Sequence, residues 1–133
     1  EDCLLACAEL GRRPLVVTRH PSNVPEGAFA VEYAPFSQLL PRSAAIIHHG
    51  GVGTVAQALA SGTRQLVLPQ AHDQFDNAYL VESLGAGRWC RKPQRLRADL
   101  GTLLAQECRR YPAHSGLTEA ALAITSLANF PSS

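Results

Sequence analysis

The chain has 133 residues, of which 46% are apolar, a size and composition typical of one globular domain with one core. Twelve Lys and Arg residues against eleven Asp and Glu residues leave a net charge of +1, which gives no electrostatic argument for a nucleic-acid partner or an anionic membrane. The four cysteines form no CxxC pair, and no apolar run approaches the roughly eighteen residues of a membrane span. We therefore expect a cytoplasmic protein with reduced thiols; peripheral attachment to a membrane stays open.

Short apolar runs alternate with helical patterns along the chain. In chain order, the predicted elements are a helix at 4–10 ending near Gly11, a strand at 15–19, a loop at 21–27, a strand at 29–33, a short helix or turn at 35–42, a strand at 44–48, a helix at 52–61 ending at Gly62, a strand at 65–69, a helix at 76–84, a strand at 88–90, and helices at 97–109 and 117–128. This alternation predicts an α/β fold, a Rossmann-like parallel sheet with helices on both faces. Such sheets bind ligands beyond the carboxyl ends of their strands.

A glycine-rich turn follows the third predicted strand and leads directly into a helix. Gly50, Gly51 and Gly53 let the backbone approach a ligand closely and allow positive φ angles. The helix that follows presents free N–H groups and the positive end of its dipole at the same point. His49 and the hydroxyl of Thr54 add hydrogen-bond donors. The turn therefore predicts a site for phosphate or pyrophosphate.

The same turn has three other interpretations. It can be only a tight connection between strand and helix. A metal site would use His48 and His49 with His72 and Asp73, but adjacent residues of a strand point to opposite faces and cannot easily bind one ion. His48 is then expected to pack on, or cap, the other side of the turn. A dinucleotide site would pair the glycines with an acid about 20 residues on, and Asp73 fits this partly.

Residues 33–78, YAPFSQLLPRSAAIIHHGGVGTVAQALASGTRQLVLPQAHDQFDNA, resemble the donor-binding signature of the family 1 glycosyltransferases, enzymes of the GT-B fold that use nucleotide sugars. The bacterial natural-product, rhamnosyl and sterol enzymes are the most similar in type. The motifs HHGGVGT, ASG, LVLPQAHDQFDNA and LGAG at these spacings carry the resemblance. It implies that residues 1–133 are the C-terminal, donor-binding half of a GT-B fold. A chain that contains no methionine and begins inside a helix is then expected to lack the domain's first strand and the N-terminal acceptor domain.

The resemblance also implies roles for individual residues. The implied diphosphate-binding residues are His49, Gly51, Val52, Gly53 and Thr54. The implied nucleoside-binding residues are Tyr33, Phe36, Ser37 and Gln57. The implied sugar-binding residues are Asp73 and Gln74, whose carboxylate and amide suit the hydroxyls of a pyranose ring.

Some of these residues also have ordinary structural interpretations. Tyr33 alone would be a core aromatic at a strand end, and Asp73-Gln74 alone would be a helix N-terminal acid followed by a surface polar residue. Gln57 stands where plant members have a glutamate that contacts ribose, which leaves the ribose contact and the base preference open. Arg64 stands where this family commonly has a proline.

The activity implied by the resemblance is sugar transfer with inversion, in which an acceptor hydroxyl attacks the anomeric carbon of a UDP- or dTDP-sugar. His49 and the helix N-terminus would stabilise the departing nucleoside diphosphate, so neither a metal nor a cofactor is expected. The general base of the family is a histidine of the acceptor domain, and the isolated chain is therefore expected to be inactive. A dinucleotide-binding domain of an NAD-dependent oxidoreductase and a non-catalytic nucleotide-binding module remain alternatives.

The expected partners follow from the same resemblance. They are the nucleotide-sugar donor, the missing acceptor domain and a small-molecule or lipid acceptor, with no nucleic acid. The surface left by the missing domain could support a homodimer of the isolated chain. A cluster of basic residues is expected to be a solvated surface loop, with contact to lipid or to a partner domain left open; its members are Arg88, Arg91, Lys92, Arg95 and Arg97.

Overall fold

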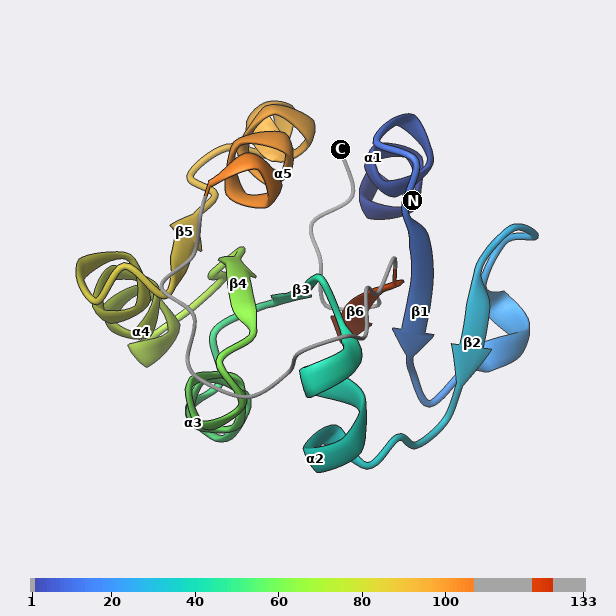
Figure 1. The fold of residues 1–133 in the computed structure, drawn as a ribbon, viewed down its shortest axis with the longest axis horizontal. Helices are drawn as coiled ribbons and strands as arrows, with labels where there is room; N and C mark the ends of the chain where they lie inside the picture. The colour runs from blue at the N-terminus through green and yellow to red at the C-terminus, as the bar shows by residue number, and fades with distance from the viewer. Residues whose placement is uncertain (1, 107–120, 126–133) are drawn as a thin grey trace.

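A computed structural model describes residues 2–106 and 121–125 and shows one sheet of six parallel strands in the order β2-β1-β6-β3-β4-β5 (Figure 1). The strands are β1 (Arg13–Val17), β2 (Phe29–Val31), β3 (Ala45–His48), β4 (Arg64–Val67), β5 (Gly87–Trp89) and β6 (Ala121–Thr125). The α-helices are α1 (Asp2–Glu9), α2 (Phe36–Leu39), α3 (Val52–Ser61), α4 (Asp73–Ser83) and α5 (Leu96–Ala105). Short 3₁₀ turns are η1 (Pro21–Asn23), η2 (Leu40–Arg42) and η3 (Pro93–Arg95).

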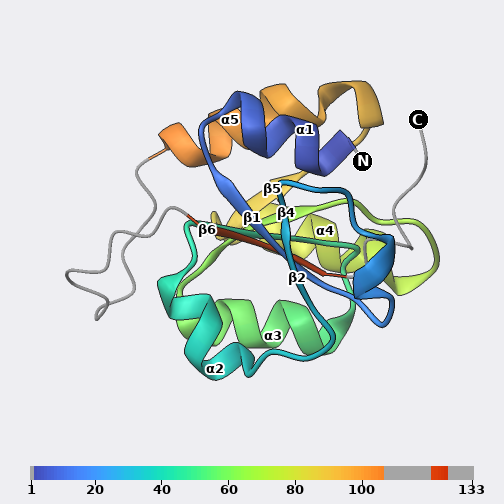
Figure 2. The ribbon, with the colours of Figure 1, turned by 90° about the vertical axis from the view of Figure 1, so that its right-hand side faces the viewer.

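Helices cover both faces of the sheet, as Figure 2 shows, with α1 and α5 on one side and α2 and α3 on the other. Strand β3 is buried along its whole length, as expected for a strand of a parallel sheet covered on both faces. On β3, Ile47 packs in the core under α1 and α5, whereas its neighbour Ile46 packs in the opposite core with Leu40 and Ala58. The predicted α/β fold, with a parallel sheet between two helical layers, is confirmed.

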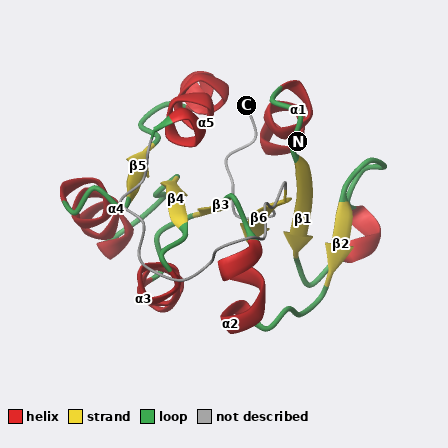
Figure 3. Cartoon of the chain, viewed as in Figure 1, coloured by secondary structure: helices red, strands yellow, loops and turns green. Residues whose placement is uncertain are grey.

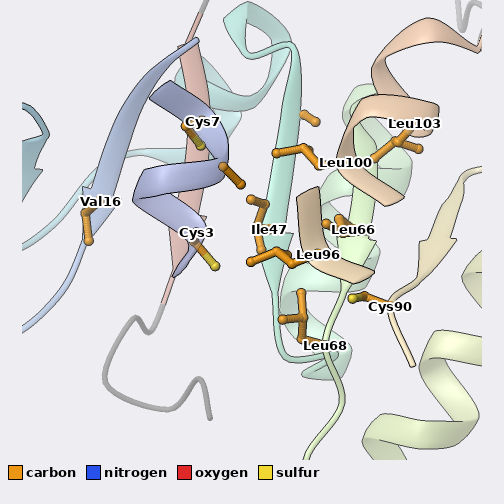
Figure 4. Packing of buried hydrophobic residues seen from close by; sticks show 12 residues of the cluster. Cys3, Cys7, Val16, Ile47, Leu66, Leu68, Cys90, Leu96, Leu100 and Leu103 are labelled. Carbon is orange, nitrogen blue, oxygen red and sulfur yellow. The ribbon is translucent and has the colours of Figure 1, made fainter. Parts of the chain in front are cut away.

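The larger core lies between the sheet and the α1–α5 layer (Figure 4). Leu66 of β4 and Leu96, Leu100 and Leu103 of α5 are almost fully buried there. Burying a leucine side chain contributes about 2 kcal/mol. This packing joins the α1–α5 layer to the sheet whose carboxyl ends carry the loops of the predicted site.

Most predicted elements are present with small shifts of their ends. The helix predicted at 52–61 is α3 to the residue, and Gly62 ends it with a φ of 72°. The helix predicted at 76–84 is α4, which begins three residues earlier, at Asp73, and so includes both predicted sugar-binding residues. Strands β1 and β2 end before the predicted residues, which leaves Tyr33 in a loop. The last three residues of the helix predicted at 97–109 lie outside the described residues.

The helix predicted at 117–128 is wrong in its described part, where residues 121–125 form strand β6. The backbone of β6 pairs in parallel with β1 on one side and β3 on the other, and Figure 3 shows it between them. A short apolar run is compatible with either a buried strand or a helix by its pattern alone. Residues 121–125 form a strand because the backbones of β1 and β3 supply hydrogen-bond partners on both sides. Residues 117–120 and 126–128 lie outside the described part.

Arg64, at the start of β4, binds the carboxyl end of α5. Its Nη1 donates hydrogen bonds to the backbone oxygens of Leu103 at 3.1 Å and Leu104 at 2.8 Å. These carbonyls belong to the last turn of the helix, where positive charge is favourable. Arg64 therefore joins α5 to the sheet.

We expect Arg64→Ala to lower the free energy of unfolding by about 1.5 kcal/mol, because two hydrogen bonds from a charged donor are lost. Urea unfolding measures this, with Arg97→Ala as the control. Arg97 pairs with Glu9 on an exposed surface, where such pairs contribute less than about 1 kcal/mol. Equal losses in the two variants would contradict the capping role of Arg64.

Candidate functional site

The turn between β3 and α3 leads directly into a helix whose N-terminus is open. Strand β3 ends at His48, Gly51 takes the N-cap position of α3, and the first intrahelical bond runs from the N–H of Val55 to the oxygen of Gly51. No side chain among the described residues caps this end of the helix. The N–H groups of the first turn therefore remain available to a ligand, together with the positive end of the helix dipole.

The three glycines of this turn do different things. Of the three, only Gly50 uses the freedom to adopt a positive φ, 101°. A Cβ on Gly51 would lie 3.1 Å from Cε1 of His49, so this glycine lets the imidazole ring lie against the turn. A Cβ on Gly53 would meet nothing within 4 Å. Gly53 is therefore a position that a ligand can approach without any change in the protein's own packing.

His49 stands beside the turn and is partly buried. Its Nδ1 is buried and has no hydrogen-bond partner among the described residues. A buried polar atom without a partner costs about 1–3 kcal/mol, and such atoms are rare in native proteins unless they serve a function. His49 therefore carries an energetic cost at the place where the helix N-terminus is open.

His48 lies on the other side of the turn and is fully engaged. Its Nδ1 accepts a hydrogen bond of 3.0 Å from the N–H of Gly50, so the proton must be on Nε2, which lies 2.7 Å from Oε1 of Gln65. Gln65 in turn donates to the backbone oxygen of Val55 in α3 at 3.5 Å. Burial lowers the pKa of His48 to about 4, against a smaller opposing effect of the hydrogen bond with Gln65. His48 therefore stays neutral at pH 7, and its predicted packing role is accompanied by specific hydrogen bonds.

This pKa predicts a loss of stability in mild acid. Between pH 6.5 and about 4 the unfolded chain binds a proton at His48 that the folded chain does not bind, so stability falls as pH falls through this window. The full effect is about 3 kcal/mol. Unfolding free energies measured from pH 7 to pH 4 should fall less steeply for His48→Gln than for the wild type. The exposed His20→Gln variant should keep the wild-type slope, and a His48→Gln slope equal to the wild type would contradict the assignment.

The predicted sugar-binding residues form the beginning of α4. Asp73 is its exposed first residue, and Gln74 directs Oε1 into the preceding loop, where it accepts from the N–H groups of Gln70 at 2.9 Å and Ala71 at 3.2 Å. Only the NH₂ group of Gln74 is then free to donate to a ligand. His72, before the helix, has a φ of 52° and a ψ of −131°, a strained combination for a residue with a side chain. This loop is therefore held in an unusual conformation directly before Asp73.

Asn77 contacts the predicted site in a way that the sequence did not reveal. Its Nδ2 donates a hydrogen bond of 2.8 Å to the backbone oxygen of Gly50. The only available signal is its position one helical turn after Asp73, on the same side of α4. This contact brings the predicted diphosphate-binding turn and the predicted sugar-binding helix together.

The predicted nucleoside-binding residues come from three segments: the loop after β2, helix α2 and helix α3. Tyr33 is 80% exposed in the loop after β2, and strand β2 is separated from β3 by β1 and β6. Phe36 packs against the core cluster of Leu40, Ile46 and Ala58, whereas Ser37 is exposed. Gln57 is exposed one turn after Gly53 on α3 and so lies on the face that continues from the turn.

The basic cluster from Arg88 to Arg97 is largely paired with acids. Asp99 lies 3.2 Å from Arg88 and 3.8 Å from Arg95, and Glu82 lies 2.9 Å from Arg91. Arg91 also lies 4.2 Å above the ring of Trp89, and its hydrogen bond lowers the pKa of Glu82. These ion pairs connect β5 and the segment after it with α4 and α5, and this pairing leaves less positive charge for an external anion.

Within residues 2–106 and 121–125, no three His, Cys, Asp or Glu side chains come together as a group that could hold a metal ion. The alternative metal site at the turn therefore has no such group of ligands in the described structure. In the same residues, no helix has the length and apolar character needed to cross a membrane.

A comparison with protein families shows which family the chain belongs to. The profile of the family described as "Erythromycin biosynthesis protein CIII-like, C-terminal domain" matches residues 14–126. The chain belongs to this family. Family 1 glycosyltransferases of the GT-B fold and of bacterial natural-product type make up its relatives, so the resemblance inferred from the sequence motifs is confirmed.

Curated relatives of this CIII-like domain are named glycosyltransferases. Aklavinone 7-beta-L-rhodosaminyltransferase of Streptomyces galilaeus is 41% identical over 66 residues, which are 50% of this chain and 15% of the relative. An uncharacterized glycosyltransferase of Mycobacterium tuberculosis is 32% identical over 134 residues, covering 93% of this chain and 32% of the relative. The chain therefore spans less than a third of the length of these proteins.

Solved structures agree with the fold of the CIII-like domain. Spinosyn rhamnosyltransferase SpnG has a TM-score of 0.70 at 28% identity, covering 79% of this chain and 32% of SpnG. The glycosyltransferase VinC, solved in complex with dTDP, has a TM-score of 0.67 at 30% identity, covering 79% of this chain and 29% of VinC.

Proposed function

We propose that this domain binds the nucleoside-diphosphate sugar of an inverting glycosyltransferase, with the diphosphate at the turn between β3 and α3. The observation that carries the proposal is the uncapped N-terminus of α3, with the imidazole ring of His49 lying against the turn at Gly51. A helix N-terminus with open N–H groups and an adjacent histidine suits the charge and the many acceptor oxygens of a diphosphate. Gly51, Val52, Gly53 and Thr54 would supply the backbone N–H groups and the hydroxyl of this site.

The two ends of the donor would extend from the turn in different directions. Asp73 and the NH₂ group of Gln74 are proposed to bind the sugar hydroxyls, because Asn77 of the same helix contacts the turn directly. Tyr33, Phe36, Ser37 and Gln57 are proposed to contact the nucleoside. VinC in complex with dTDP and SpnG complexed with thymidine diphosphate support a nucleoside diphosphate as the ligand class and make dTDP the first to test.

The proposed reaction is a direct displacement. An acceptor hydroxyl attacks the anomeric carbon, its proton passes to a general base, and the bond to the nucleoside diphosphate breaks with inversion. His49 and the N-terminus of α3 stabilise the negative charge that develops on the leaving diphosphate, in place of a metal ion. We assign no general base within this chain and propose that it lies elsewhere in the complete polypeptide. SpnG complexed with spinosyn aglycone supports a small-molecule acceptor.

Calorimetric titration of the complete polypeptide with dTDP, UDP and NAD tests this proposal. We expect binding of dTDP or UDP, unchanged by EDTA, and much weaker binding of NAD. Tighter binding of NAD would favour the oxidoreductase alternative and overturn the proposal. Loss of binding in EDTA would contradict the absence of a metal, and sugar transfer by the isolated 133-residue chain would contradict the assignment of the base.

A further inference from the structure

The backbone of Gly50 forms hydrogen bonds with side chains of two different elements. Its N–H donates to Nδ1 of His48, at the end of β3, and its carbonyl oxygen accepts from Nδ2 of Asn77, in α4. These two groups belong to the peptide units before and after Gly50. The two hydrogen bonds together therefore hold both backbone torsions of Gly50, at a φ of 101°.

The same residue is also packed directly against α4. A Cβ on Gly50 would lie 3.0 Å from the backbone oxygen of Gln74 and 3.1 Å from Cγ1 of Val67. The absence of a side chain is what allows the turn to approach the first turn of α4 so closely. The position of the turn relative to Asp73 and Gln74 is thus set at a single residue.

The partner of the Gly50 N–H, His48, is itself buried in the sheet. His48 is 1% exposed and Gln65 is fully buried, and their hydrogen bond of 2.7 Å leaves the imidazole with one orientation. Asn77 is half-buried and contacts the carbonyl oxygen of Gly50 from α4. A buried, fully satisfied polar network of this kind defines a unique geometry, because any displacement leaves a polar group without a partner.

We propose that His48 and Asn77 are positioning residues that hold the Gly50 backbone between them and thereby set the spacing between the diphosphate-binding turn and the sugar-binding start of α4. This inference rests on the proposed function. Neither residue has to touch the donor. Their effect is to place the N–H groups of α3 on the diphosphate while the sugar meets Asp73, so the anomeric carbon and the leaving oxygen are held in line.

A matched pair of variants separates this role from simple packing. The side-chain oxygen of asparagine can stand in for Nδ1 of histidine, whereas the amide NH₂ of glutamine reaches the position of Nε2. His48→Asn therefore keeps an acceptor for Gly50 and loses the bond to Gln65, whereas His48→Gln keeps a donor for Gln65 and loses the bond to Gly50. Asn77→Leu, of similar size and at a half-buried position, removes the hydrogen bond to the carbonyl oxygen of Gly50.

The affinities of the complete polypeptide for dTDP and for thymidine provide the test. We expect His48→Gln and Asn77→Leu each to weaken dTDP binding about tenfold, as the loss of one hydrogen bond predicts, with thymidine binding unchanged. His48→Asn should stay near the wild type. The double variant should lose less than the product of the two single losses, because both act on Gly50. In sugar transfer, kcat should fall while the KM of the acceptor stays constant.

The outcomes are distinguishable. If the wild type binds neither dTDP nor UDP, the proposed function fails and the positioning role fails with it. If the wild type binds dTDP and the variants bind it equally well, only the positioning role is overturned. Equal losses for His48→Asn and His48→Gln, or parallel losses of dTDP and thymidine binding, would show general loosening of the fold and would also overturn it. Asn77→Leu keeps the test valid if a His48 variant does not fold.

Discussion

Gly50→Ala is expected to lower the free energy of unfolding by about 3 kcal/mol, the largest stability effect of any single methyl group added in this turn. Two costs combine, because an alanine at a φ of 101° is strained and its Cβ would stand 3.0 Å from the backbone oxygen of Gln74. That oxygen belongs to α4 and cannot move aside as a flexible side chain would. Urea unfolding of the wild type and the variant measures the difference.

Two other glycines separate the two costs. Gly27 has a φ of 97° but nothing within 4 Å of a Cβ, so Gly27→Ala should show the strain alone, about 1 kcal/mol. Gly53 lies in α3 with an open surrounding and no positive φ, so Gly53→Ala should raise stability by up to about 1 kcal/mol. The same Gly53 methyl group is expected to weaken dTDP binding. A Gly50→Ala variant as stable as Gly27→Ala would show that the contact with α4 has little effect.

The second large effect is expected on catalysis. His49→Ala should lower kcat of the complete polypeptide about 10²–10³-fold, the range found when one donor to a developing negative charge is removed. Its stability should be unchanged or higher, because the change removes a buried Nδ1 that has no partner among the described residues. Steady-state kinetics with a dTDP-sugar and thermal unfolding measure the two quantities.

Because Nδ1 of His49 is buried, the control for His49 is designed around the other ring nitrogen, Nε2. His49→Gln places an amide donor near the position of Nε2 and should restore part of the activity, whereas His49→Asn should not. A His49→Ala enzyme with wild-type kcat would contradict the role of this residue at the leaving group. A stability loss as large as that of Gly50→Ala would identify His49 as a structural residue.

Local chemical signals explain which parts of the fold could be predicted from sequence. Helix α3 is bounded by a glycine turn at one end and by Gly62 in the left-handed region at the other, and both signals are visible in the sequence. Strand β6 lacks such signals. Its pairing with β1 joins Arg13 to Ala121, residues far apart in the chain, and no local pattern carries that information.

The predicted site also has one part that the sequence could reveal and one part that it could not. The glycine turn and His49 could be predicted because a strand end, the glycines and a helix start follow one another directly. The role of Asn77 could not, because it depends on how α4 approaches Gly50 in three dimensions. The ion pairs of the basic cluster could not be predicted either. Their acids lie on three different helices: Glu9 in α1, Glu82 in α4 and Asp99 in α5.

The buried cysteines of the larger core offer a way to observe motion of the helical layer that covers it. Cys3 and Cys7 face the sheet from α1, and Cys90 follows β5 beneath α5 (Figure 4). Burial raises the pKa of Cys3 and Cys7 to about 12 and that of Cys90 to about 11. In the closed state these thiols are neither ionised at pH 8 nor accessible to a reagent. Once Cys108 is replaced by serine, the alkylation rate of the three native cysteines therefore measures how often α1 and α5 open transiently from the sheet. No probe has to be introduced into the protein.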